Sequence, residues 1–293
     1  MTTDEVPDPD AEKSAPRAAR ELAPWEHAKE SGAELPAGLH GGATPIPSRT
    51  YLLLRWVWKA AAAALGFRIV LEGVEHMPLG PDGRPRGGML VAGMPHRSWP
   101  DPFLPWIAFP TRPRFCFFGD AHTMARDPLR RFIMARLGGV IPIPSGRDPK
   151  TVEVHLAAAQ AVLASGAQFL LFPETGPASE LGTIRRLGLG TGYMALRNRA
   201  PILPFVLGGN HELYFGRRFI LRILPPLDPI SLAGLDPAAP LPEQGSSAER
   251  AAVHGIMAGL AAAVAADVAD VHARAVAMEP RRKRGRFLTQ LFR

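Results

Sequence analysis

The residues of this chain best suited to chemistry lie in the segment HRSWPD at residues 96–101, directly after an apolar run of strand length at residues 89–94. In α/β sheets ligands bind beyond the carboxyl ends of strands, so His96 is well placed to act. Asp101 follows across a turn that contains Pro100. Its carboxylate can fold back to the imidazole, fix the tautomer and stabilise the imidazolium once the ring accepts a proton.

The sequence contains no nucleophile motif of the G-x-S-x-G type. A His96–Asp101 pair would therefore activate a group on a substrate rather than a nucleophile of the protein. The competing interpretation is structural: His96 is a packing residue and Asp101 is the cap of a helix.

Three further segments carry polar or proline residues just beyond apolar runs. FPETG at 172–176 contributes Glu174, GVIPIPSGR at 139–147 ends in Arg147, and APILP at 200–204 ends in Pro204. Taken singly, each has a structural explanation: a turn, a surface ion pair or proline punctuation.

The elements that must position these residues alternate along the chain. Strands are expected at residues 67–72, 89–94, 114–119, 140–144, 167–173, 200–209 and 219–227, the last near an edge because prolines follow it. Helices are expected at residues 51–67, 127–138, 148–166, 188–199 and 246–276. This alternation predicts an α/β fold with a mixed, largely parallel sheet flanked by helices.

Composition divides the chain into three parts. Residues 1–47 are rich in Ala, Pro, Glu and Gly and are expected to form a disordered leader. Residues 48–278 form the folded domain, and residues 279–293 form a basic tail. The one cysteine, Cys116, excludes a disulfide framework and a thiolate zinc site, and it lies in an apolar run typical of a core strand.

The net charge of +7 fits an anionic membrane surface, a nucleic acid or an acidic substrate. No stretch approaches 18 uninterrupted apolar residues, so no ordinary spanning helix is expected. The acidic first residues argue against a signal peptide. A cytoplasmic protein peripheral to the membrane is the resulting prediction.

Two segments are candidate membrane contacts. The helix at residues 51–67 carries Trp56 and Trp58 and either lies in the lipid interface or packs as a core helix. The tail mixes cations with apolar groups and either binds anionic lipid or is a solvated tail.

In order and spacing, the four blocks that contain His96, Arg147, Glu174 and Pro204 resemble the glycerolipid and lysophospholipid acyltransferase family, which includes 1-acylglycerol-3-phosphate acyltransferases. The resemblance runs from about residue 51 to residue 227 and includes the approach GVEHMP at residues 73–78. It implies the fold of that family, with an N-terminal interfacial helix.

The resemblance also implies the reaction, transfer of a fatty acyl group from acyl-CoA or acyl carrier protein to the hydroxyl of a lysophospholipid. His96 would be the general base and Asp101 would orient it. Arg147 and the segment Glu174-Thr175-Gly176 match positions associated with acceptor binding, and Pro204 matches the acyl side of the pocket. A thiolate is a good leaving group, so no metal and no cofactor beyond the acyl donor are expected.

The third block departs from the family pattern F-P-E-G-T-R, because Pro177 stands where an arginine is common. That arginine would hold a phosphate through its planar fork. Arg185 and Arg186 follow eight to nine residues later and either supply the missing charge or form a solvated pair. The acceptor is therefore open between a phosphorylated lysophospholipid and a lyso-lipid or glycolipid without phosphate.

Two other function classes compete with this interpretation. A non-catalytic lipid-binding member of the fold is disfavoured by the intact His96–Asp101 pair. Nucleic-acid binding is favoured by the positive charge alone, since the chain shows no recognised module and no aromatic stacking pattern, so no nucleic-acid partner is expected.

Overall fold

The computed structural model describes residues 44–98, 100–120, 139–143, 157, 159–175 and 180–291. Most of the expected leader, residues 1–43, lies outside the described residues. So do the expected helix at 127–138, the first part of the expected helix at 148–166, Arg147 and Gly176.

Seven strands form one sheet in the order β1-β7-β6-β2-β5-β3-β4. All neighbouring pairs are parallel except β6 and β7, which are antiparallel. The predicted mixed, largely parallel α/β sheet is thereby confirmed. The strands are β1 Arg68–Glu72, β2 Leu90–Met94, β3 Phe115–Asp120, β4 Val140–Ile143, β5 Gln168–Leu171, β6 Ile202–Gly208 and β7 Arg218–Ile223.

Strand β7 lies one position in from the edge, because β1 pairs with its outer side. The prolines that suggested an edge, Pro225 and Pro226, come after the strand has ended at Ile223 and leave its hydrogen bonds intact.

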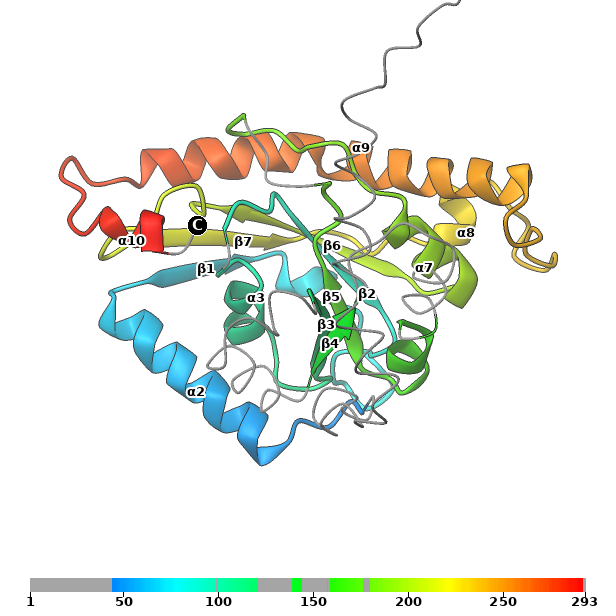
Figure 1. The fold of residues 1–293 in the computed structure, drawn as a ribbon, viewed down its shortest axis with the longest axis horizontal. Helices are drawn as coiled ribbons and strands as arrows, with labels where there is room; N and C mark the ends of the chain where they lie inside the picture. Colours follow the sequence, from blue (N-terminus) through cyan, green and yellow to red (C-terminus); the bar gives the residue numbers. More distant parts are fainter. Residues whose placement is uncertain are drawn as a thin grey trace, which may run out of the picture.

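Helices cover both faces of the sheet (Figure 1). One face packs against α7 Gly190–Asn198, α8 Pro229–Leu232 and the long α9 Ser247–Ala277, and the other against α2 Arg49–Ala64 and α3 Phe103–Ala108. The alternation of β2 serves both layers: Leu90, Ala92 and Met94 pack on the α9 side, and Val91 packs on the α2 side.

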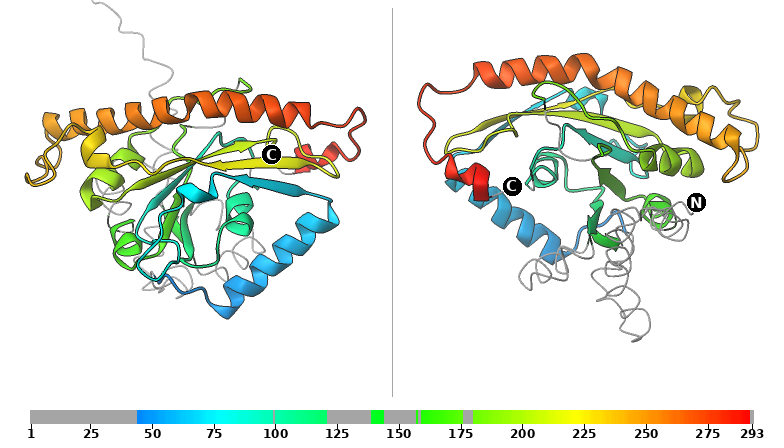
Figure 2. Two further views of the ribbon diagram at one scale, coloured as in Figure 1. Left: turned by 180° about the vertical axis from the view of Figure 1, so that it is seen from behind. Right: turned by 45° about the horizontal axis from the view of Figure 1, so that its top comes forward.

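Helix α9 runs along the sheet from one end of the molecule to the other (Figure 2). Its N-cap is Ser246, whose hydroxyl accepts a hydrogen bond from the backbone N–H of Glu249 at 3.1 Å. Val253, Leu260 and Val268 are among the side chains it buries against the sheet.

Within the described residues, α9 is the one helix long and apolar enough to cross a membrane by length and composition. The sequence contains no uninterrupted apolar run of that length here, because Asp267 and Asp270 interrupt the second half of α9. Its buried face is that of a core helix, so this is weak evidence for membrane attachment.

Helix α2 has the reverse of the usual polarity of a surface helix. Its cation Arg55 is buried, whereas Leu52, Leu53, Trp56 and Val57 are exposed. Arg55 donates through Nε to the carbonyl of Trp106 at 2.8 Å and through Nη2 to the carbonyls of Ile107 and Phe109, which lie at the end of α3. Burial lowers the pKa of this guanidinium.

The basic tail contains a short helix, α10 Phe287–Leu291, which the sequence did not suggest. It packs beside the end of β7 (Figure 1), and its Leu288 is buried in the same cluster as Phe103 and Phe219.

Candidate active site

The sheet topology brings two of the sequence blocks to one rim. Strands β2 and β5 are parallel neighbours, with Ala92 opposite Leu171. Two residues beyond the end of β2 the chain reaches His96, and three residues beyond the end of β5 it reaches Glu174. Residues that lie far apart in the sequence therefore meet at the carboxyl ends of the central strands.

His96 and Asp101 form the predicted pair. The imidazole Nδ1 lies 3.0 Å from Asp101 Oδ2. A carboxylate accepts hydrogen bonds, so Nδ1 carries the proton and Nε2 presents its lone pair. The His96 side chain is 37% exposed and Asp101 is fully buried, so the ring reaches solvent while its partner does not.

Asp101 is held by the turn that contains it. Its carboxylate accepts hydrogen bonds from the backbone N–H groups of Arg97 at 2.6 Å and Ser98 at 2.8 Å, and from the Ser98 hydroxyl at 2.7 Å. The helix-cap alternative does not hold, because the N-cap of α3 is Pro102 and no side chain caps that helix.

Glu174 connects the two blocks through backbone contacts. Its Oε2 accepts from the N–H of His96 at 2.5 Å and its Oε1 accepts from the N–H of Arg185 at 2.7 Å. Both carboxylate oxygens thus hold the main chain around His96. The structure gives Glu174 a positioning contact, and its part in acceptor binding stays a prediction.

Thr175 continues this arrangement, since its N–H and its hydroxyl both donate to the carbonyl of Arg186, at 3.1 and 3.0 Å. The side chains of Arg185 and Arg186 are exposed beside the site. Arg147 and Gly176 lie outside the described residues, so their placement is not described.

Pro204 is buried within the central strand β6, opposite Ala92 of β2. It is absent from the lining of the described pocket. A proline fits here because the antiparallel register with β7 begins at the next residue, Phe205, and Pro204 contributes its carbonyl as acceptor for the N–H of Leu224.

Three residues that sequence reasoning passed over complete the rim. The Phe172 ring lies 4.6 Å from the imidazole of His96, and Asn210 Nδ2 donates to the carbonyl of Pro95 at 2.9 Å. Arg97 donates to the carbonyl of Glu180. Burial lowers the pKa of Arg97, and the charges of Glu174 and Asp101 offset part of that effect.

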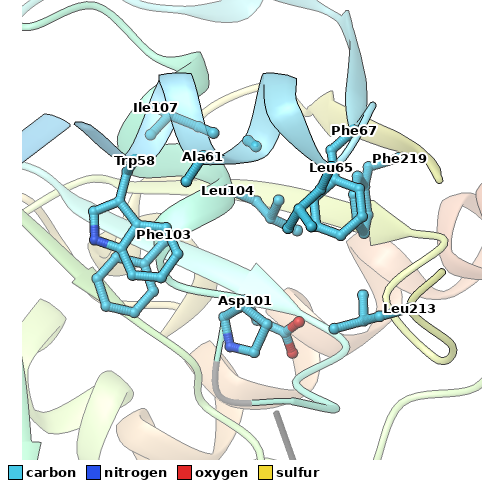
Figure 3. Close-up of a pocket in the computed structure, with 12 residues that line it drawn as sticks. Trp58, Ala61, Leu65, Phe67, Asp101, Phe103, Leu104, Ile107, Leu213 and Phe219 are labelled. Carbon is cyan, nitrogen blue, oxygen red and sulfur yellow. The ribbon is translucent and has the colours of Figure 1, made fainter. Parts of the chain in front are cut away.

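An apolar pocket adjoins the pair (Figure 3). It encloses about 500 Å³ of space, counting the part open to solvent at its mouth. Asp101 is the one charged residue that lines it, and the Trp58 and Phe103 rings stack on one side at 4.4 Å. The remaining lining residues are Ala61, Ala62, Leu65, Phe67, Pro100, Leu104, Ile107, Leu213 and Phe219.

The sequence did not predict the pocket, because its walls come from separate elements: α2, α3, β7 and the loop between β6 and β7. Single apolar residues such as Leu213 give no local signal.

The fold and the site together define an α/β protein with a His–Asp pair at the sheet rim, next to a pocket for an apolar group. The family model described as Acyltransferase matches residues 68–208, which contain that pair and Glu174. This match supports the resemblance to the acyltransferase family, and with it acyltransferase activity in general terms.

The chain is also similar to a solved structure, the 1-acyl-sn-glycerophosphate (LPA) acyltransferase PlsC from Thermotoga maritima. Sequence identity is 19%, the match covers 79% of this chain and 81% of that chain, and the TM-score is 0.47. No curated protein matches.

Proposed function

We propose that this protein transfers a fatty acyl group from acyl-CoA or acyl carrier protein to the hydroxyl of a lysophospholipid such as 1-acylglycerol-3-phosphate. The observation that carries the proposal is the His96–Asp101 pair, bonded at 3.0 Å, with Asp101 also lining an apolar pocket. A base and a site for a hydrocarbon chain therefore lie together.

In the proposed mechanism His96 Nε2 takes the proton of the acceptor hydroxyl. The oxygen attacks the thioester carbonyl carbon, a C–O bond forms, and the C–S bond breaks as the tetrahedral intermediate collapses. The leaving thiolate takes the proton back from the imidazolium. Asp101 holds the ring by Nδ1 and stabilises its cationic form.

The pocket is the proposed site of the acyl chain. Its lining is apolar apart from Asp101, so it offers burial to methylene groups and no partner to a charged headgroup. Each buried methylene contributes about 0.8 kcal/mol, which makes the fit of the chain a large part of donor binding.

The acceptor phosphate is assigned to arginines. Pro177 has no donor side chain. The charge of the phosphate would therefore be met by Arg147, helped by Arg185 or Arg186. The exposed side chains of Arg185 and Arg186 support this, because the backbone of Arg185 is fixed to Glu174 beside His96. A lyso-lipid with a neutral or sugar headgroup is the second candidate, favoured by the same Pro177.

A peripheral position at the cytoplasmic face of the cell membrane fits these substrates. The exposed Leu52, Leu53, Trp56 and Val57 on α2 give an apolar surface suited to a lipid interface. The exposed Arg281, Arg282 and Arg284 of the tail suit anionic headgroups.

The test is release of free CoA by the wild-type protein with hexadecanoyl-CoA and a panel of acceptors, with products identified by mass spectrometry. Acylation of lysophosphatidic acid is the expected result, and acylation of an uncharged lyso-lipid alone would favour the second candidate. Lipid binding without turnover on any acceptor or donor would favour the non-catalytic interpretation.

Arg186→Ala and Arg147→Ala sharpen the assignment of the acceptor. Each substitution should raise the KM for a phosphorylated acceptor by about tenfold or more, because the phosphate loses a cationic partner. The KM for the acyl donor should stay unchanged. Equal KM values for all proteins would contradict the arginine assignment.

A further inference from the structure

The C-terminal segment of residues 279–291, called here the C-terminal strap, is bound to the loop that connects β6 and β7. Lys283 Nζ lies 2.6 Å from Glu212 Oε2 and 2.5 Å from Glu279 Oε2, and Arg286 also pairs with Glu212. Burial lowers the pKa of Lys283, but hydrogen bonds with the two carboxylates outweigh it and the pKa is raised. Part of the basic charge of the tail is therefore used inside the protein.

Glu212 and Glu279 lie close enough to His211 to suggest a metal site. Each carboxylate is already paired with a cationic side chain, Glu279 with Arg217 as well as Lys283. These contacts make the cluster an ion-pair clasp, and a divalent cation would have to displace Lys283.

Beyond the clasp, the strap grips one residue of the loop by its backbone. Thr289 Oγ1 accepts a hydrogen bond from the N–H of Leu213 at 2.8 Å and donates one to the carbonyl of Leu213 at 3.0 Å. The neighbouring Leu288 is buried in the same cluster as Leu213. One hydroxyl thus satisfies both main-chain groups of a single buried residue.

The strap is also closely fitted at Gly285. An added Cβ there would lie 2.4 Å from the Phe215 ring, and the residue has φ +74. The N–H of Phe215 donates to the carbonyl of Arg284 at 2.9 Å. Only glycine allows this approach in a left-handed conformation, so the strap follows a defined path over the loop.

Leu213 is the residue on which these contacts converge, and its side chain lines the apolar pocket together with Asp101 (Figure 3). The same loop reaches the other wall, since the N–H of Gly216 donates to the carbonyl of Leu65, the C-cap of α2, at 2.8 Å. The pocket wall is therefore supported from outside by the strap.

We propose that the C-terminal strap seats Leu213 in the wall of the acyl pocket and so makes Leu288 and Thr289 determinants of acyl-chain length. The proposal rests on the proposed acyl-transfer function. With the strap in place the pocket is closed on the Leu213 side. When the contacts of Leu288 and Thr289 with Leu213 are lost, Leu213 can move outward and the pocket admits longer chains.

The test compares Thr289→Val, which removes the hydroxyl at similar size, with Thr289→Ser, which keeps it. Gln290→Ala, an exposed residue of the same helix, is the matched control. The readout is the ratio of kcat/KM for octadecanoyl-CoA to that for dodecanoyl-CoA with detergent-dispersed lysophosphatidic acid. Thr289→Val and Leu288→Ala should raise this ratio about fivefold, and the two other variants should stay within about twofold of wild type.

Hydrogen exchange at the Leu213 amide tests the strap without any turnover. Thr289→Val should speed exchange there about tenfold, whereas Thr289→Ser should not. Unchanged exchange in a folded Thr289→Val protein would overturn the strap, and faster exchange with an unchanged chain-length ratio would overturn its role in selectivity. A wild-type protein without acyl transfer would instead overturn the proposed function and leave the exchange result to judge the strap.

Discussion

The turn of residues 96–101 and the apolar pocket share Asp101 but are built in opposite ways. The turn is local: His96, Ser98 and Asp101 lie within six residues and satisfy one another through short hydrogen bonds. The pocket is assembled from α2, α3, β7 and a loop that the C-terminal strap supports. A change in the turn should therefore remove chemistry, and a change in the pocket should alter which chain is accepted.

The difference also concerns polarity. In the turn the hydrogen bonds converge on the buried carboxylate of Asp101, and each has a specific geometry. Replacing a single atom there should therefore change the arrangement. In the pocket the interaction is non-directional and scales with buried area, so volume matters more than any single contact.

After the loss of His96 itself, the largest effect is expected from Asp101→Asn, which keeps the volume and removes the charge that supports His96. Turnover should fall by about 10²-fold at unchanged KM for the donor, the usual scale for a disabled general base. Ser98→Ala, which removes one donor to the same carboxylate, should cost only a few-fold. The measurement is steady-state kinetics of the two folded variants. Similar losses of turnover in Asp101→Asn and Ser98→Ala would mean that the charge of Asp101 is not required for catalysis.

The pocket should respond to volume. Ala62→Phe fills it from α2, so kcat/KM for hexadecanoyl-CoA should fall by about tenfold while that for octanoyl-CoA changes little. Ala63→Phe, at an exposed position of the same helix, is the control. A parallel loss on both donors in Ala62→Phe would place the acyl chain elsewhere.

The outer face of α2 should affect membrane attachment and leave the pocket intact. Trp56 is 66% exposed, and Trp56→Ser should weaken sedimentation with anionic vesicles about tenfold without changing turnover on detergent-dispersed substrate. Full vesicle binding by this variant would shift the attachment to the exposed cations of the tail.

The smallest effect concerns acid stability on the pocket side. Burial, together with the charge of Arg217, lowers the pKa of His211 to about 4, and the unfolded chain titrates near its ordinary 6.5. Between these values the unfolded state binds more protons, so the free energy of unfolding rises with pH and falls as the solution is acidified.

The contribution of His211 to this loss between pH 7 and pH 4.5 should be about 2 kcal/mol. His211→Gln should flatten that part of the profile, measured by urea unfolding at several pH values. The other charged or titratable groups near His211 are present in both proteins: Arg217, Glu279, His272 and Lys283. An equally steep profile in the variant would show that those groups account for it.

The sequence predicted the local features of the molecule and not those that are assembled from distant segments. The strand pattern predicted the sheet because apolar runs such as residues 89–94 are contiguous, and the spacing of His96 and Asp101 predicted their contact. Glu174 was placed at the rim correctly, but its bonds to the backbone of His96 and Arg185 depend on strand order. No local sequence pattern predicts the order of the strands in the sheet.

The C-terminal tail shows the limit most clearly. Its cations suggested a solvated or lipid-bound segment, yet Lys283 and Arg286 pair with Glu212, some 70 residues earlier, and Leu288 is buried. Charge composition alone cannot reveal partners that distant in the sequence. In the same way, no local pattern shows that Arg55 of α2 is buried, because its carbonyl partners belong to α3.

The central claim is that His96 removes the proton of the acceptor hydroxyl. The most direct measurement is the rate of CoA release by His96→Ala under saturating donor and acceptor, with its fold verified by circular dichroism and its donor affinity by equilibrium binding. Normal donor binding and a turnover lowered by at least about 10²-fold are expected. Wild-type turnover by the folded His96→Ala protein would contradict it.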